Sequence, residues 1–164
     1  MDTLLYTSRY FRVIRPCYKA TEAIMHTDYE DVLELPDGEE LTPENLYNHA
    51  CDVIKGRWPE AEPTIMEDPG WTYRYAEYVI KGRWPEAEPI IMKDPKYAYY
   101  YAEYVIKGRW PEAEPTIMEN PTYAHYYARN VIKGRWPEAE PTIMKNTLAW
   151  EYYRKRFFNS PGLI

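Results

Sequence analysis

Four Arg-Trp pairs are the first residues of this 164-residue sequence whose types and spacing could do chemistry. Arg57, Arg83, Arg109 and Arg135 each precede a tryptophan, and the pairs stand 26 residues apart. Guanidinium groups hold phosphates and aromatic rings stack on bases, so such a ladder could bind a nucleotide or a single-stranded nucleic acid. Glutamates two and four residues after each tryptophan oppose that chemistry, because they would repel phosphates.

A tyrosine-rich set of residues falls at positions that differ between copies of the same 26-residue spacing. One position holds Tyr78, Tyr104, Asn130 and Asp52, a second holds Arg74, Tyr100, Tyr126 and Asn48, and a third holds Gly70, Lys96, Thr122 and Glu44. We expect these positions to be exposed, since they accept polar residues of several kinds. Tyrosine gives a large rigid contact area at low entropic cost, so the set predicts a partner-binding surface.

The alternative is that these tyrosines pack between neighbouring helices with only their tips in water. The sequence leaves both interpretations open for Tyr100 and Tyr104, whereas Tyr101 and Tyr127 are assigned to the core.

An acidic run forms a third candidate site. From Asp28 to Glu44 there are eight acidic residues and no basic one. The run is either a solvated loop or an acidic arm that engages a basic partner surface. Its candidate contact residues are Asp31, Glu34, Asp37, Glu39 and Glu40.

The signals of catalysis, metal binding and cofactor binding are missing from the sequence. His26, His49 and His125 are scattered, and Cys17 and Cys51 stand 34 residues apart, so neither type shows zinc-ligand spacing. No glycine-rich phosphate loop is present. Glutamate pairs such as Glu112 and Glu114 point to different sides of a helix and are expected to charge its N-terminus favourably. The sequence therefore predicts a protein without enzymatic activity, metal or cofactor.

The overall charge balance bears on partners and location. Twenty Lys and Arg against 26 Asp and Glu give a net charge of -6, which argues against general nucleic-acid or anionic-membrane binding. No apolar run approaches the roughly 20 residues that span a bilayer, and two cysteines suit a reducing compartment, so a cytoplasmic protein is expected. Residues 1–42 carry -5 and residues 43–68 carry -4, whereas residues 121–146 and 147–164 each carry +2. These opposite ends are consistent with head-to-tail homo-oligomers.

Helix-start and helix-end signals recur in each repeat, and they predict the helices that position these residues. The string Val-Ile-Lys-Gly-Arg-Trp-Pro-Glu-Ala-Glu-Pro begins at Val53, Val79, Val105 and Val131. Thr42, Asp68, Asp94 and Asn120 each precede a proline, which is a strong helix-start signal. The glycine that follows each Val-Ile-Lys is expected to supply a left-handed residue at the helix end.

In the third full unit these signals predict a helix over 95–107 and a second, shorter helix over 111–118. The apolar stripe of the first helix predicts helix-to-helix packing, with each tryptophan filling the gap between units. The fold class is all-α, an α-solenoid of antiparallel helix pairs with a 26-residue repeat. Its parts are a degenerate capping repeat at 1–28, an acidic insertion at 29–42, four repeats at 43–146 and a capping helix and tail at 147–164.

The helix-pair pattern resembles tetratricopeptide and Sel1-like repeats, although the 26-residue unit is shorter and their consensus residues are absent. The repeated string, followed by Asp/Asn-Pro-x-Tyr-Ala-x-x-Tyr-Ala, resembles a short helical repeat of uncharacterised proteins from tailed phages and large DNA viruses. The resemblance covers about 43–146. It implies a viral origin and expression in a host cell, and it implies no activity.

These observations together predict a non-enzymatic protein–protein interaction module. In its concrete form it is a phage or viral effector in the host cytoplasm that binds and inhibits or redirects a host protein, such as a defence component. Two alternatives stay open: nucleotide or single-stranded nucleic-acid binding through the Arg-Trp ladder, and a self-assembling structural or virion protein.

Overall fold

The computed structural model describes Leu35 and residues 39–158. The chain separates into two compact units, residues 1–41 and 42–164. The expected capping repeat at 1–28 lies outside the described residues, and so does most of the acidic insertion. In the second unit, the described residues form helices, turns and loops without strands. The predicted all-α class is therefore confirmed for this part of the chain.

One long helix begins every 26 residues in the described unit. Each of the first four starts as an α-helix and continues into π-helical hydrogen bonding over its last turn. The α and π segments are α1 (Pro43–His49) with Ala50–Ile54, α3 (Pro69–Arg74) with Tyr75–Ile80, α5 (Pro95–Tyr100) with Tyr101–Ile106, and α7 (Pro121–Tyr127) with Ala128–Ile132. The fifth helix, α9 (Thr147–Phe157), is α-helical throughout.

The helix starts form as the sequence predicts. The Asp68 side chain accepts hydrogen bonds from the backbone N–H groups of Gly70, at 2.8 Å, and Trp71, at 2.9 Å. Asp94 and Asn120 cap α5 and α7 in the same way, and Thr42 caps α1 through its hydroxyl. Proline follows each cap at the first helical position, where its missing N–H costs nothing.

The helix ends differ from the prediction. The left-handed residue is the lysine before each glycine: Lys55, Lys81, Lys107 and Lys133 have φ between 56° and 60°. The prediction of a left-handed glycine was wrong because the last turn is π-helical and reaches its end one residue earlier. Each glycine instead donates its N–H to a carbonyl six residues back, as Gly82 does to Ala76 at 3.3 Å.

The second element of each unit is shorter than expected. Prolines and a tight turn precede single α-helical turns: α2 (Glu62–Ile65), α4 (Glu88–Ile91), α6 (Glu114–Ile117) and α8 (Glu140–Ile143), the last preceded by a 3₁₀ turn over Pro137–Ala139. In the third unit the helix begins at Glu114, where Pro111 was the expected start, because residues 111–113 form the turn.

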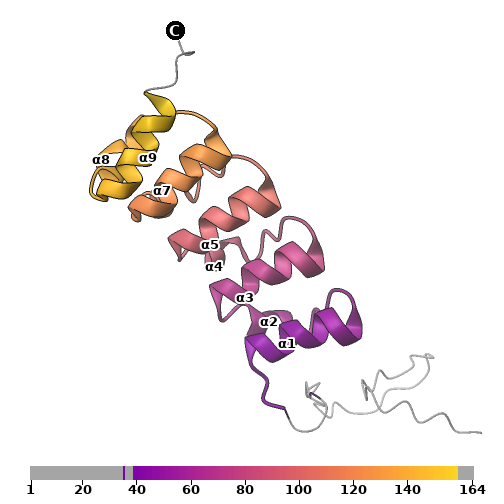
Figure 1. Ribbon diagram of the computed structural model, residues 1–164. Helices are drawn as coiled ribbons and strands as arrows, with labels where there is room; N and C mark the ends of the chain where they lie inside the picture. The colour runs from indigo at the N-terminus through magenta and orange to yellow at the C-terminus, as the bar shows by residue number, and fades with distance from the viewer. Residues whose placement is uncertain (1–34, 36–38, 159–164) are drawn as a thin grey trace, which may run out of the picture. The chain divides into compact units, whose positions relative to one another are not determined.

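The long helices lie side by side in one row, and each contacts the next one along the chain (Figure 1). Each short helix packs against the long helix of its own unit and so forms a second layer. Between the layers, Tyr101, Ala102 and Ile117 are fully buried. The recurring tryptophans at 58, 84, 110 and 136 are only 1–5% exposed, so they belong to the core.

Candidate partner-binding surface

A band of aromatic side chains crosses α3, α5 and α7. It comes from the third, fifth, sixth and tenth residues of each long helix. We call it the tyrosine band, and it comprises Trp71, Tyr73, Tyr78, Tyr97, Tyr99, Tyr100, Tyr104, Tyr123 and Tyr126.

The band is continuous because its rings contact one another across helices. The Tyr73 ring lies 6.3 Å from that of Tyr97 and 5.8 Å from that of Tyr100, between ring centroids. One repeat later, Tyr99 stands in the same relation to Tyr123, at 6.1 Å, and Tyr126, at 6.0 Å. Each fifth residue therefore packs against the third and sixth residues of the following helix.

The outer rings of the band are open to water. Tyr78 is 56% exposed, Tyr104 47% and Tyr126 38%. Tyr100 is half-buried against Tyr73, Tyr99 and Tyr104. The structure thus places Tyr104 on the surface and Tyr100 between helices with one part exposed, while Tyr101 and Tyr127 are buried in the core as expected.

Beneath these rings, Tyr73 and Tyr99 form a buried support. Tyr73 donates its hydroxyl to Glu77 on the same helix. Tyr99 accepts a hydrogen bond from the Asn130 amide of the next helix, at 2.7 Å. Burial and then the neighbouring glutamates, Glu77 and Glu103, raise the pKa of both tyrosines. Because these phenols stay protonated near neutral pH, they act as structural hydrogen-bonding groups.

The other predicted surface residues have defined places. The exposed Arg74 guanidinium lies 4.5 Å above the Trp71 ring, which fixes both at the start of the band. Asn130 is half-buried through its bond to Tyr99. Gly70, at a position expected to be exposed, is buried because the Tyr97 ring covers it.

The four repeated arginines take part in an inter-repeat network. Arg83 forms two hydrogen bonds to the Glu88 carboxylate, from Nε to Oε1 at 2.8 Å and from Nη2 to Oε2 at 2.9 Å. Glu88 also accepts the hydroxyl of Tyr101, and that hydroxyl accepts the backbone N–H of Trp84. Arg57, Arg109 and Arg135 occupy equivalent networks.

This network gives the second glutamate of each pair a role that the sequence did not reveal. Its carboxylate is 10–13% exposed and joins an arginine of its own repeat to a tyrosine of the next. The arginines are about half exposed. Their guanidinium faces are therefore partly reachable, while their charge is matched by a carboxylate and their tryptophan neighbours are buried.

The predicted acidic contact residues fall mostly outside the described part of the chain. Glu39 and Glu40 are exposed. Asp31, Glu34 and Asp37 lie outside the described residues.

Tyr73 and Tyr99, which support the tyrosine band, were not among the site residues predicted from the sequence. Tyr73, Tyr99 and the glutamates four residues after them stand at i and i+4 on consecutive helices, a spacing that places them on one face. That pattern was present in the sequence, and it could have predicted a buried tyrosine–glutamate row beside the exposed positions.

The described residues offer few groups for metal binding or acid–base chemistry. These residues hold no group of three or more His, Cys, Asp or Glu side chains that could bind a metal. His125 is buried, and burial followed by the Arg129 charge lowers its pKa. A depression of about 130 Å³ between the ends of consecutive long helices is lined by charged residues such as Glu77, Lys81 and Lys107.

Within residues 39–158 no helix is long and apolar enough to cross a membrane.

Comparison of the chain with protein-family models, with curated protein sequences and with solved structures finds no match.

Proposed function

We propose that this chain is a non-enzymatic protein–protein interaction module whose contact surface is the tyrosine band. The observation that carries the proposal is the combination of exposure and order in the band. Tyr78, Tyr104 and Tyr126 are 38–56% exposed, and the band they belong to is joined by ring contacts across three helices.

The ordering of the tyrosine side chains matters because binding loses less conformational entropy when neighbouring residues already fix the side chains that make contact. Tyr100 packs against four neighbouring tyrosines, and Tyr99 is fixed by Asn130. Rigid aromatic side chains with polar tips are the residues that interfaces favour. The band therefore supplies contact area without the ordering cost that flexible side chains would add.

The proposed architecture is an α-solenoid of antiparallel helix pairs with the 26-residue repeat as its unit. Contacts between consecutive long helices and the four equivalent inter-repeat networks support it. In such an array every unit adds the same kind of surface, so the binding face grows with the number of repeats. The resemblance to viral repeats adds the proposal that the partner is a host protein, inhibited or redirected by a viral effector.

Self-association is a second candidate function, and exposed apolar residues on and just before α9 favour it. Met144 is 51% exposed, Leu148 61% and Tyr152 57%. They lie together at the last helix of the described row. Light scattering over a concentration series tests this candidate, because a monomer at every concentration would exclude it.

Binding of single-stranded nucleic acid through the Arg-Trp ladder is less well supported. Each arginine is ion-paired to a glutamate, and the tryptophan rings are too buried to stack on a base. The Trp84 ring, for example, is 1% exposed and packs at 5.2 Å against Tyr75.

The test is a capture experiment with the full chain and a variant carrying Tyr78→Ala, Tyr104→Ala and Tyr126→Ala. A matched control carries Glu60→Ala, Glu86→Ala and Glu112→Ala, which are exposed residues of the second layer. We expect the control to retain a stoichiometric partner and the tyrosine variant to lose it, with both keeping the helical circular-dichroism spectrum of the parent. Retention of the partner by a folded tyrosine variant would contradict the proposal.

A further inference from the structure

Charge is divided between the two layers of the described unit. From Pro69 to Phe158, the long helices together with their terminal lysines hold nine basic and three acidic residues, a net charge of +6. The loops and short helices at 82–94, 108–120 and 134–146 hold five basic and eight acidic residues, a net charge of -3. The chain as a whole is acidic, at -6, so the positive layer is a local feature that the net charge conceals.

The positive charge lies on the surface. Eight of the nine basic residues of this layer are exposed and Lys96 is half-buried. The nine are Arg74, Lys81, Lys96, Lys107, Arg129, Lys133, Arg154, Lys155 and Arg156. Two of the three acidic residues, Glu77 and Glu103, are half-buried, and Glu77 accepts the hydroxyl of Tyr73. The basic groups therefore extend further into water than most of the acidic ones.

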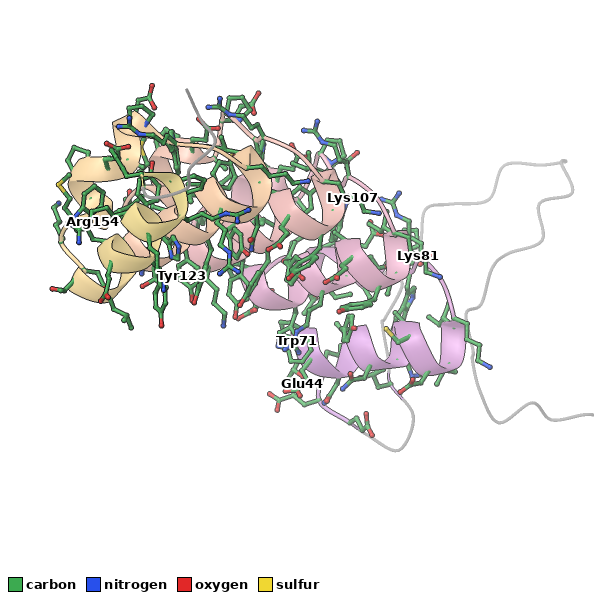
Figure 2. The ribbon with its side chains drawn as sticks, turned by 45° about the horizontal axis from the view of Figure 1, so that its top comes forward. Glu44, Trp71, Lys81, Lys107, Tyr123 and Arg154 are labelled. Atoms are coloured by element: carbon green, nitrogen blue, oxygen red, sulfur yellow. The ribbon has the colours of Figure 1, made fainter. Side chains whose placement is uncertain are left out.

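Four of these nine basic residues, Arg74, Lys81, Lys96 and Lys107, lie beside residues of the tyrosine band. The Arg74 guanidinium lies over Trp71, and the Lys96 ammonium lies 4.9 Å from the centroid of the Tyr97 ring. Lys81 and Lys107 lie along one edge of the helix row, and Trp71 and Tyr123 lie along the opposite edge (Figure 2). Arg74 and Lys96 thus lie against the rings of Trp71 and Tyr97, and Lys81 and Lys107 line one depression together with Tyr104.

We infer that the partner segment recognised by the tyrosine band is an acidic, extended peptide that runs across the long helices. The inference rests on the proposed function and specifies the chemistry of its partner. Carboxylates of such a segment would pair with the exposed arginines and lysines, while its apolar side chains would lie on the rings of Tyr78, Tyr104 and Tyr126. Charge complementarity of this kind sets specificity and association rate.

The spacing of the helices fits an extended chain. Packed helices stand about 8–10 Å apart, which is about three residues of a polyproline II chain that rises about 3.1 Å per residue. Such a chain has three residues per turn, so an acidic residue at every third position points to the same side and can meet a basic group on each helix. Crossing from α3 to α9 takes three helix steps, so a segment of about nine residues covers the face.

A nucleic acid fits the same face less well. Glu77 and Glu103 lie among the band residues, where evenly spaced phosphates would pass close to both carboxylates. A peptide can place neutral side chains at those points, because its charges need not be regular. We therefore assign the face to acidic protein and use an oligonucleotide as a competing probe.

The test measures binding of fluorescently labelled nonapeptides to the full chain by anisotropy. One peptide carries Glu at every third position between Leu and Tyr residues, and its control carries Gln in place of Glu. We expect the Glu peptide to bind at least about tenfold more tightly, and raising salt from about 0.05 M to about 0.3 M to weaken it strongly, since the pairs are exposed. Equal affinity for the two peptides would overturn the inference.

Charge-reversal variants localise the effect. Arg74→Glu with Arg129→Glu changes the long-helix layer, and the matched pair Lys93→Glu with Lys145→Glu changes exposed residues of the second layer by the same amount. We expect the first pair to weaken binding of the Glu peptide at least about tenfold and the second pair by less than about twofold. Equal weakening by both pairs would show a general charge effect and overturn the inference.

Two further outcomes separate the possible failures. Tighter binding of a nine-nucleotide oligothymidine than of the Glu peptide would overturn the acidic-protein assignment in favour of nucleic acid. If the tyrosine variant loses its captured partner while the Glu peptide binds no better than the Gln peptide, the proposed function stands and this inference fails. If the tyrosine variant keeps its partner, the proposed function itself fails.

Discussion

The hydroxyl of Tyr101 accepts the backbone N–H of Trp84 at 2.7 Å, and so joins residues that stand 17 apart in different repeats. The same hydroxyl donates to Glu88 at 3.1 Å, while the Tyr101 ring packs at 5.0 Å against Trp110 of its own repeat. One side chain therefore contacts both repeats, through its hydroxyl to the preceding one and through its ring to its own. Tyr75, Tyr127 and Tyr153 make the equivalent backbone contacts.

Removing this hydroxyl should destabilise the array. We expect Tyr101→Phe to lower the free energy of unfolding by about 1–3 kcal/mol, because the buried Trp84 N–H loses its acceptor and Glu88 loses a donor. Urea denaturation measures the change. In the control Tyr152→Phe, where the ring is 57% exposed, we expect a change below about 0.5 kcal/mol. Equal effects of the two substitutions would contradict a stabilising role for the network.

Alkaline pH should unfold the protein through the same tyrosines. Burial, and to a smaller extent the adjacent Glu62, Glu88 and Glu140 carboxylates, raise the pKa of Tyr75, Tyr101 and Tyr153 from 10.0 to about 12. A raised pKa means that the folded state favours the neutral phenol.

The resulting stability is fully present below pH 10 and is lost as the pH rises toward about 12, since the unfolded chain releases these protons first. We expect circular dichroism to show cooperative loss of helix in this window, together with the ultraviolet absorbance of ionised tyrosine. Ionisation of every tyrosine, including Tyr75, Tyr101 and Tyr153, near pH 10 with the helices retained to pH 12 would contradict this account.

Helix starts and long-helix positions could be predicted from the sequence because their causes are local. A capping side chain and a following proline fix the first turn, as Asp94 and Pro95 do for α5. The helix end was harder, since π-helical bonding over Tyr101–Ile106 moves the left-handed residue to Lys107. The spacing of residues in the sequence alone does not encode that change in hydrogen bonding.

Part of the candidate site could also be predicted from the sequence, by comparing equivalent positions of the repeats. Variation between repeats identified Tyr78 as a surface residue, because exposed positions tolerate change, whereas the sequence leaves the exposure of Tyr104 open, and this residue is 47% exposed. It did not distinguish Gly70, which varies yet is buried under Tyr97. The bond from Asn130 to Tyr99 spans 31 residues, and no local pattern specifies a contact of that range.

Glycine substitutions can test the close approach of α3 and α5. A Cβ at Gly70 would lie 2.7 Å from the tip of the Tyr97 ring, so Gly70→Ala should displace that ring. Because the far end of the half-buried Tyr97 side chain can move aside, we expect a loss of about 1 kcal/mol in the free energy of unfolding, measured in urea, at the lower end of overpacking costs. Gly82 is the matched control, because nothing lies within 4 Å of its added Cβ and its φ lies outside the left-handed region. Gly82→Ala should be neutral or stabilise by up to about 1 kcal/mol. Equal losses at both sites would contradict this packing.

The left-handed lysines offer the opposite kind of test, a substitution that should stabilise. Lys107 has φ 59°, a conformation that costs an L-residue roughly 1–2 kcal/mol and glycine little. We expect Lys107→Gly to raise the free energy of unfolding by about 0.5–1 kcal/mol after the entropy of the added glycine is counted. Glu151→Gly is the control, because the exposed Glu151 lies in the middle of α9 and glycine there should cost about 1 kcal/mol. Urea denaturation of both variants gives the sign directly, and destabilisation by Lys107→Gly would contradict the left-handed assignment of the helix end.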